Sequence, residues 1–202
     1  MWESRMGLEN VKSGKLLYHL TELKNLESII RFGLIPRKVL LENTVTFEDI
    51  ANPEIIVKRE RLGLDEYIPF HFHPYTAFDL AVKKQHANDE MMYICIRREL
   101  ARRNNFKVLP KHPLSLEDCQ LYDYEEGFKR IDWDTMAKVG LTDPDSKQTK
   151  MAECLSAKVI PVDCFQCFYV PSEQSKEFAE NTLRAYGIKF PPPFVNVMPQ
   201  WF

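Results

Sequence analysis

The chain has 202 residues, of which 45% are hydrophobic and 28% are charged. This composition is typical of a globular protein and excludes a fibrous or disordered chain. We expect one domain over residues 1–202. The net charge of −2 excludes a uniformly basic protein, so any site for a polyanion must come from a local patch of cations.

The sequence predicts a cytoplasmic protein that has no membrane association. Its first residues are polar and lack the apolar segment of a secretory signal, and no apolar run is long enough to cross a bilayer. The five cysteines are expected to be reduced. Cys164 and Cys167 have the spacing of a metal or redox pair, but no second pair accompanies them, so we expect buried free thiols.

The first half of the chain predicts strands that alternate with helices. Residues 16–20 predict a short strand, Thr21 an N-cap, and the apolar spacing that follows a helix closed by Gly33. Residues 36–66 predict a long loop with some helix around 46–51. A strand over 67–72 is followed by a helix to about His86, which Thr76 and Asp79 would start with a capping box.

The second half continues this pattern. We expect a buried strand at 91–96, a basic helix at 97–103, a strand at 106–109, a helical or irregular segment at 115–138, a turn at 143–146 and a strand at 165–170. Ser172 would cap a last helix, closed by Gly187, with four residues on one face: Phe178, Thr182, Ala185 and Tyr186. The aromatic side chains of the extended tail should pack on the body. The fold class is therefore α+β.

Three side chains could form a ligand site at strand ends. His19 lies two residues before Thr21, so its ring and the threonine hydroxyl could reach one ligand, although a packed histidine beside an ordinary cap fits the pattern as well. Glu153 enters a strand among apolar residues, where a carboxylate is costly to bury. A salt bridge with Lys147 or Lys150 is the alternative role for it.

Two further clusters were considered. His71, His73 and His86 could form a metal site, but no carboxylate or cysteine completes a familiar ligand spacing, so we predict no metal. A basic run is opposed only by Glu99 and could contact a phosphate backbone, or could be an ordinary solvated helix face. Its members are Arg97, Arg98, Arg102, Arg103, Lys107 and Lys111.

Taken together, four stretches resemble the DarT family, the toxin half of DarT–DarG toxin–antitoxin systems. They are residues 16–35, 67–82, 130–138 and 146–161. The resemblance implies an ADP-ribosyltransferase fold, with a split mixed β-core and flanking helices around a cleft for NAD⁺. It also implies transfer of ADP-ribose to a base in single-stranded DNA, and a macrodomain antitoxin of the DarG type as partner.

The resemblance also assigns roles to residues. His19 and Thr21 would hold NAD⁺, with Gly33, Leu34 and His71 on the same cofactor side, and Glu153 would be the catalytic glutamate. A carboxylate suits this chemistry, because loss of nicotinamide develops positive charge on the ribose. It can also anchor the 2′-hydroxyl and accept a proton from the attacking base. The basic run, here Arg97, Arg98, Arg102, Arg103 and Lys107, would contact the DNA.

One position departs from the family. Thymine-modifying members typically have Phe-x-Pro-Arg, whereas this chain has Tyr75 after Pro74. A tyrosine cannot replace a cation, so His71, His73 or an arginine from residues 58–61 takes over, or the chain modifies guanine. We therefore include His73 and Tyr75 among the catalytic candidates and favour guanine over thymine. Two other functions stay open: an ADP-ribosyltransferase acting on RNA or protein, and a non-catalytic module that binds single-stranded nucleic acid.

Overall fold

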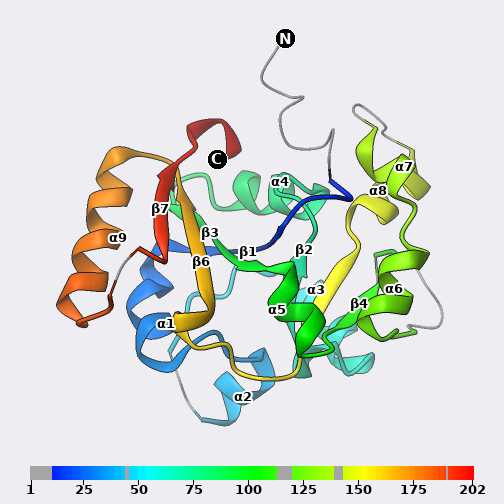
Figure 1. The fold of residues 1–202 in the computed structure, drawn as a ribbon, viewed down its shortest axis with the longest axis horizontal. Coiled ribbons are helices and arrows are strands. Elements are labelled where there is room, and N and C mark those ends of the chain that lie inside the picture. Colours follow the sequence, from blue (N-terminus) through cyan, green and yellow to red (C-terminus); the bar gives the residue numbers. More distant parts are fainter. Residues whose placement is uncertain (1–10, 44–45, 113–119, 139–142, 190) are drawn as a thin grey trace.

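A seven-stranded mixed sheet forms the centre of the protein, in the order β4-β5-β2-β1-β3-β6-β7 (Figure 1). The computed structural model describes residues 11–43, 46–112, 120–138, 143–189 and 191–202. Neighbouring strands are antiparallel except β6 and β7, which are parallel. The strands are β1 (Leu16–Glu22), β2 (Ile68–His71), β3 (Met91–Arg97), β4 (Lys107–Leu109), β5 (Glu153–Ser156), β6 (Phe165–Val170) and β7 (Phe194–Val197).

The sheet opens between β1 and β2. These strands pair only at Tyr18 and His71, whereas β1 pairs with β3 along its whole length. Beyond this pair a side chain joins the two strands: His19 Nδ1 donates to the Pro69 carbonyl at 2.8 Å. The expectation of an α+β fold with a split mixed core is confirmed, and the opening is where the pocket described below lies.

Helices cover the sheet at both ends and on both faces. Helix α9 lies beside β7 at one end, and α6, α7 and α8 gather near β4 at the other (Figure 1). The helices are α1 (Leu26–Phe32), α2 (Arg37–Glu42), α3 (Pro53–Arg61), α4 (Ala77–Gln85), α5 (Arg98–Arg103), α6 (Tyr124–Arg130), α7 (Trp133–Ala137), α8 (Pro144–Lys150) and α9 (Glu173–Ala185). No helix in the described ranges is long and apolar enough to span a membrane.

The position of strand β3 within the sheet explains why its sequence is almost continuously apolar. Successive side chains of a strand point to opposite faces of the sheet. Met92 and Ile94 enter the main core, whereas Tyr93 and Cys95 enter a second core. The last two residues of the tail, Trp201 and Phe202, pack against this second core, as expected for the tail. Because both faces are covered, β3 has no solvent-facing alternation.

Several local signals are confirmed. Thr76 and Asp79 form the capping box of α4, and Ser172 caps α9. Gly33 closes α1 with a φ of +82°. A side chain at this position would also meet the Ile160 carbonyl oxygen at 2.7 Å, so both the backbone and the space require glycine.

Other local expectations were wrong. Thr21 lies within β1 and does not cap a helix, because α1 begins only after Asn25. Residues 46–51 are not helical, and two helices, α2 and α3, occupy the segment expected to be mostly loop. Asn52 caps α3, and Pro53 stands in its first turn. Asn followed by Pro is a typical signal for the start of a helix, and the sequence analysis did not use it here.

Two corrections concern the second half. Asp143 does not simply mark a turn but caps α8, with its side chain accepting from Ser146 N. The buried face of α9 carries Ser175, Ala179 and Leu183, whereas Phe178 is 49% exposed. Part of the segment expected to be helical or irregular, residues 113–119, lies outside the described residues. The remainder holds α6 and α7.

Candidate active site

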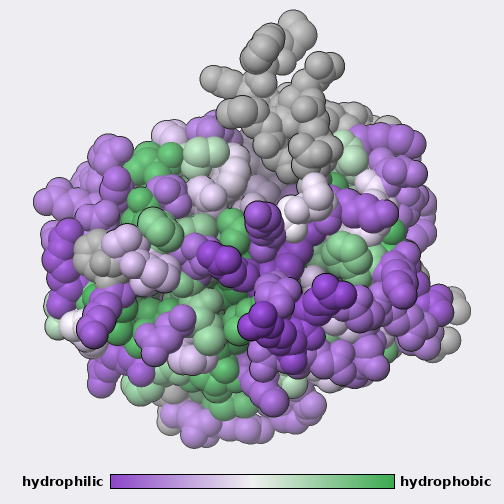
Figure 2. Space-filling model, in the orientation of Figure 1, coloured by the Kyte–Doolittle hydropathy of each residue, from purple (hydrophilic) through white to green (hydrophobic). Residues whose placement is uncertain are grey.

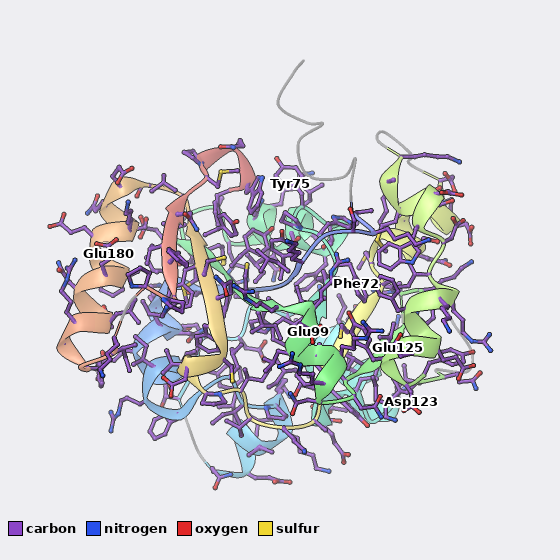
Figure 3. The ribbon with its side chains drawn as sticks, viewed as in Figure 1. Phe72, Tyr75, Glu99, Asp123, Glu125 and Glu180 are labelled. Carbon is purple, nitrogen blue, oxygen red and sulfur yellow. The ribbon has the colours of Figure 1, made fainter. Side chains whose placement is uncertain are left out.

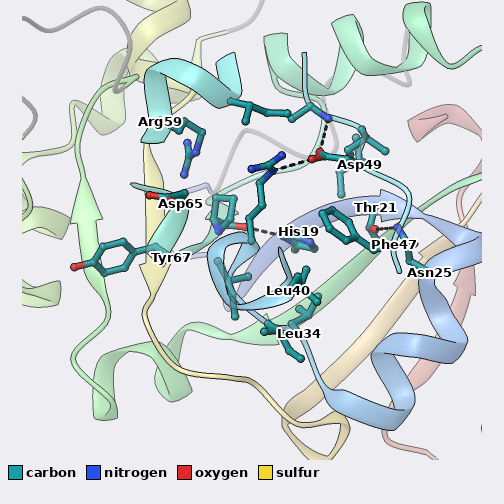
Figure 4. A pocket seen from close by; sticks show the side chains of 18 of the residues that line it. His19, Thr21, Asn25, Leu34, Leu40, Phe47, Asp49, Arg59, Asp65 and Tyr67 are labelled. Carbon is teal, nitrogen blue, oxygen red and sulfur yellow. Dashed lines mark hydrogen bonds and ion pairs between the residues drawn. The ribbon is translucent and has the colours of Figure 1, made fainter. Parts of the chain in front are cut away.

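A pocket lies at the opening between β1 and β2, walled by α1, α2, α3 and the segment at 46–51 (Figure 4). Six residues singled out in the sequence line it: His19, Thr21, Gly33, Leu34, His71 and Glu153. They come from three strands and from the end of α1, so only the folded chain brings them together.

The floor of the pocket holds an ion pair between Glu153 and Arg59. Arg59 Nη1 donates to the two carboxylate oxygens of Glu153 at 2.8 and 3.0 Å. The side chains are 6% exposed for Glu153 and 16% for Arg59. Glu153 therefore pairs with an arginine from α3 and not with Lys147 or Lys150. Arg59 Nη2 is buried and has no hydrogen-bond partner within the described chain, so it can donate to an oxygen of a ligand.

His71 holds the strand that carries Glu153. The two residues are directly opposite in the register of β2 and β5. His71 Nδ1 lies 3.3 Å from the carbonyl of Ala152, the residue before Glu153, and donates to it. The ring also lies 6.1 Å from that of Phe78, centroid to centroid. These contacts orient β5 at the point where the carboxylate enters the pocket.

His19 offers a neutral ring to the pocket. Burial lowers the pKa of His19, and the nearby His71 lowers it further, whereas the hydrogen bond to Pro69 opposes the shift. Since Nδ1 donates to the Pro69 carbonyl, Nε2 is the unprotonated nitrogen and can accept from a ligand. This buried, oriented ring suits a neutral polar ligand group better than an anion.

Thr21 belongs to a small polar network that shapes one wall. Asn25 Nδ2 donates to the Thr21 hydroxyl oxygen at 3.0 Å, which leaves the hydroxyl proton for another acceptor. Asn25 also holds the backbone of Glu48, donating to its carbonyl at 2.9 Å and accepting from its N–H at 2.8 Å. The segment that carries Phe47 and Asp49 is thereby fixed against the pocket (Figure 4).

Arg37 and His112 are among the pocket residues that the sequence analysis missed. Arg37 links α2 to the walls, donating to Asp49 at 2.8 Å and to Glu60 at 3.0 Å. His112 lines the pocket on the same side as Glu153. Burial lowers the pKa of His112, and the charge of Glu153 opposes this shift. Neither residue belongs to a recognisable local motif, so only the fold reveals its place.

Comparison with known proteins decides the family. A family model described as "ssDNA thymidine ADP-ribosyltransferase, DarT" matches residues 18–202. The chain belongs to the DarT family. The predicted enzyme class, an NAD-dependent DNA ADP-ribosyltransferase, is confirmed by this membership.

Individual DarT proteins are similar over nearly the whole chain. A DNA ADP-ribosyl transferase from Thermus sp. (strain 2.9) is 23% identical over 207 residues, which cover 92% of this chain and 95% of the relative. The structure of Thermus sp. 2.9 DarT in complex with ADP-ribosylated ssDNA has a TM-score of 0.79 and 19% identity, with 94% of this chain and 97% of that chain covered. The same enzyme in complex with NAD⁺ has a TM-score of 0.74 at 19% identity, covering 93% and 97%.

Two catalytic candidates lie outside the pocket of this DarT chain. His73 is buried, with Nδ1 donating to the Pro74 carbonyl at 2.7 Å, and burial lowers its pKa to about 4. Tyr75 is exposed and is not among the lining residues. Their role in catalysis therefore stays a prediction that the pocket does not support: His73 packs beyond the end of β2, and Arg59 is the cation beside Glu153.

The basic run of this DarT chain is not a free strip of cations. Arg98 is 7% exposed, and its guanidinium donates to the carbonyls of Lys12, Leu16 and Phe72. Its predicted DNA contact is therefore wrong, because its donors hold the backbone together inside the protein. Hydrophilic side chains do gather over α5 (Figure 2).

The other members of the run have polar or acidic partners. Arg102 pairs with Glu125, Arg103 with Glu99, Lys107 with Asp123, and Arg97 donates to Gln166. The three acids, Glu99, Asp123 and Glu125, are labelled in Figure 3. These exposed pairs neutralise most of the positive charge that the sequence pattern suggested.

The three histidines considered for a metal do not form a site. Within the described ranges, the one cluster of three possible ligands is Glu22, His86 and Asp89, which leaves out His71 and His73. The four cysteines in these ranges, Cys95, Cys154, Cys164 and Cys167, are free thiols, as expected. Cys119 lies outside the described residues.

Proposed function

We propose that this chain transfers ADP-ribose from NAD⁺ to guanine in single-stranded DNA, with Glu153 as the catalytic carboxylate. The observation that carries the proposal is the Arg59–Glu153 pair, which lies in the same pocket as His19 and Thr21. A buried carboxylate held by one arginine, beside neutral donors and acceptors, suits a substrate that becomes positively charged as it reacts.

His19 and Thr21 supply the polar contacts for NAD⁺. The unprotonated Nε2 of His19 accepts a hydrogen bond, and the Thr21 hydroxyl donates one. Gly33 and Leu34 supply backbone and apolar contact beside them. The buried Nη2 of Arg59 donates to a ribose or phosphate oxygen. These contacts place the nicotinamide ribose near Glu153.

Glu153 acts at the bond that breaks. The bond between nicotinamide and the ribose carbon lengthens, neutral nicotinamide leaves with the bonding electrons, and positive charge develops on the ribose. The carboxylate stabilises that charge and binds the 2′-hydroxyl. A nitrogen of the base attacks the ribose carbon, and its proton passes to Glu153. Arg59 keeps the carboxylate in place during these steps.

Tyr75 supports guanine as the acceptor. The family model is described as a thymidine transferase, and thymine-modifying members typically carry arginine at this position. Tyr75 lies outside the pocket and cannot supply a cation there. The lining arginines are Arg37, which is engaged by two carboxylates, and Arg59, which is engaged by Glu153. The cations around this pocket are therefore arranged differently from those of thymine-modifying members, which favours a different acceptor base.

A macrodomain antitoxin of the DarG type is the proposed partner. The structure of Thermosipho africanus DarTG in complex with ADP-ribose has a TM-score of 0.76 at 18% identity, with 94% of this chain and 51% of that chain covered. The antitoxin would remove the ADP-ribose that this chain adds. Co-expression should therefore relieve the toxicity of the active chain.

The test incubates the protein and a Glu153→Gln control with NAD⁺ and defined acceptors. One single-stranded oligonucleotide contains guanine but no thymine, and a second contains thymine but no guanine. Both are compared with duplex DNA, RNA and protein. Mass spectrometry locates the adduct. Guanine modification in single strands supports the proposal, thymine modification overturns the choice of base, and modification of RNA or protein alone overturns the DNA acceptor. NAD⁺ left intact with every acceptor would indicate a binding module without catalysis.

A further inference from the structure

We propose that the exposed ring of Tyr75, backed by Lys83, is a stacking platform for a base that flanks the accepting base in single-stranded DNA. The inference rests on the proposed function, because it traces the path of the strand on which the pocket would act. It also gives Tyr75 a role outside the chemistry, in binding the DNA.

The backbone at Tyr75 directs its ring into solvent. Tyr75 is 47% exposed and has a φ of +72°, a left-handed conformation that bulky residues rarely adopt. Its N–H donates to the hydroxyl of Tyr93 at 3.2 Å, and Tyr93 is buried in β3. An unfavourable conformation that the core holds in place around an exposed aromatic ring points to a use for that ring.

Lys83 supports the ring and adds positive charge. Its Nζ lies 4.3 Å from the centroid of the Tyr75 ring and 5.4 Å from that of Phe202. No hydrogen-bond partner for this ammonium is found in the described part of the chain. The nearest acid on the same helix, Asp79, accepts from Thr76 N at 2.7 Å. The Lys83 ammonium thus contacts two aromatic rings and forms no ion pair within the described residues. Burial lowers the pKa of Lys83, and the charge of Asp79 acts on the ammonium and opposes this shift.

The platform lies at the same end of the sheet as the catalytic carboxylate. His71 is directly opposite Glu153, and Tyr75 follows four residues later along the chain. Four residues span at most about 14 Å, so the ring is within a few nucleotides of a base bound at Glu153. Tyr75 lies beside α4, at the edge of the body (Figures 1 and 3).

An exposed aromatic face backed by an ammonium that forms no ion pair within the described residues suits single-stranded nucleic acid. Unpaired bases stack on such faces with little regard to sequence, whereas bases in a duplex already stack on one another. On α5, by contrast, Arg102 and Arg103 are each paired with an acidic side chain. We therefore place the flanking strand along Tyr75 and not along α5.

The test compares two variants of Tyr75 with one variant of α5. Tyr75→Asn removes the ring but suits the left-handed backbone, and Tyr75→Phe keeps the ring. The double variant Arg102→Ala, Arg103→Ala removes the competing surface. Binding of a fluorescent single-stranded oligonucleotide is measured by anisotropy without NAD⁺, and the KM values for oligonucleotide and NAD⁺ are measured by adduct formation. Circular dichroism and thermal unfolding establish that each variant is folded.

We expect Tyr75→Asn to weaken oligonucleotide binding by about tenfold and to raise the KM for oligonucleotide similarly, as loss of one base stack predicts. Tyr75→Phe and the α5 variant should bind as the wild type does, and the KM for NAD⁺ should not change. As the oligonucleotide is shortened past the flanking base, the wild type and Tyr75→Asn should converge.

Equal binding by the wild type and Tyr75→Asn would overturn the platform, as would an equal loss with Tyr75→Phe or a greater loss with the α5 variant. The two proposals fail separately. If the wild type binds through Tyr75 but modifies no DNA, the proposed function fails and the platform stands. If Tyr75→Asn binds and modifies DNA like the wild type, only the platform fails.

Discussion

Arg59 donates to both carboxylate oxygens of Glu153, across 94 positions of sequence, and joins helix α3 to strand β5, which carries this carboxylate. The pair explains how a carboxylate can be buried at the start of β5. Buried charges are tolerated when they are paired and hydrogen-bonded. It also makes the pocket depend on α3, a helix that the sequence pattern did not predict.

Glu153→Gln should lower the rate of ADP-ribose transfer by about 100-fold or more, because it removes the charge that stabilises the ribose. The measurement is the initial rate of adduct formation at saturating NAD⁺. Glutamine keeps the size of the side chain and a hydrogen bond to Arg59, so the fold should be retained. Alanine is a poorer test, because Glu153 is buried and its loss leaves Arg59 unpaired. Wild-type rates in a folded Glu153→Gln protein would refute the catalytic assignment.

His19→Ala should raise the KM for NAD⁺ more than it weakens binding of the oligonucleotide. The ring lines the pocket and presents Nε2 to it, whereas Tyr75 is not among the lining residues. The two quantities are the NAD⁺ KM and the oligonucleotide dissociation constant. Thr21→Val is the matched variant, since it removes the other polar contact while keeping the shape of the side chain. Unfolding of His19→Ala would show instead that the histidine serves packing alone.

His73 should make the protein less stable in acid. Its pKa falls from 6.5 to about 4 in the folded protein because the ring is buried. The unfolded chain therefore binds a proton that the folded chain does not, and stability is full above pH 6.5 and declines as the pH falls towards 4. The shift corresponds to roughly 3 kcal/mol of unfolding free energy over that interval.

Urea unfolding of the wild type and of His73→Asn, from pH 7 to pH 4.5, measures this effect. The variant should lose stability at neutral pH through poorer packing, yet its unfolding free energy should depend less on pH. Parallel pH profiles for the two proteins would show that His73 is not the titrating group.

Arg98→Met should destabilise the protein by about 3 kcal/mol or more, since three backbone carbonyls, among them that of the buried Phe72, lose their charged donor. Methionine fills much of the same space, so the loss reports mainly on the hydrogen bonds. Urea unfolding gives the magnitude. A stable Arg98→Met protein with weakened DNA binding would restore the role that the basic sequence run suggested.

The sequence by itself determined the family, the α+β class and those local signals that depend on neighbouring residues. The capping box of Thr76 and Asp79 and the cap at Ser172 could be predicted because each depends on residues within one helical turn. The positions of His19 and Glu153 followed from their motifs in family order. The residues that each motif contacts in distant parts of the chain could not be predicted from the sequence.

The tertiary structure alone decided which distant side chains meet. Glu153 lies close to lysines in sequence, yet its partner is Arg59, because the β5 edge faces α3. Arg98 looks like its exposed neighbours in the basic run, but the direction of its side chain buries it against three carbonyls. Side-chain partners at long separation are set by packing between elements, and local sequence carries little information about that packing.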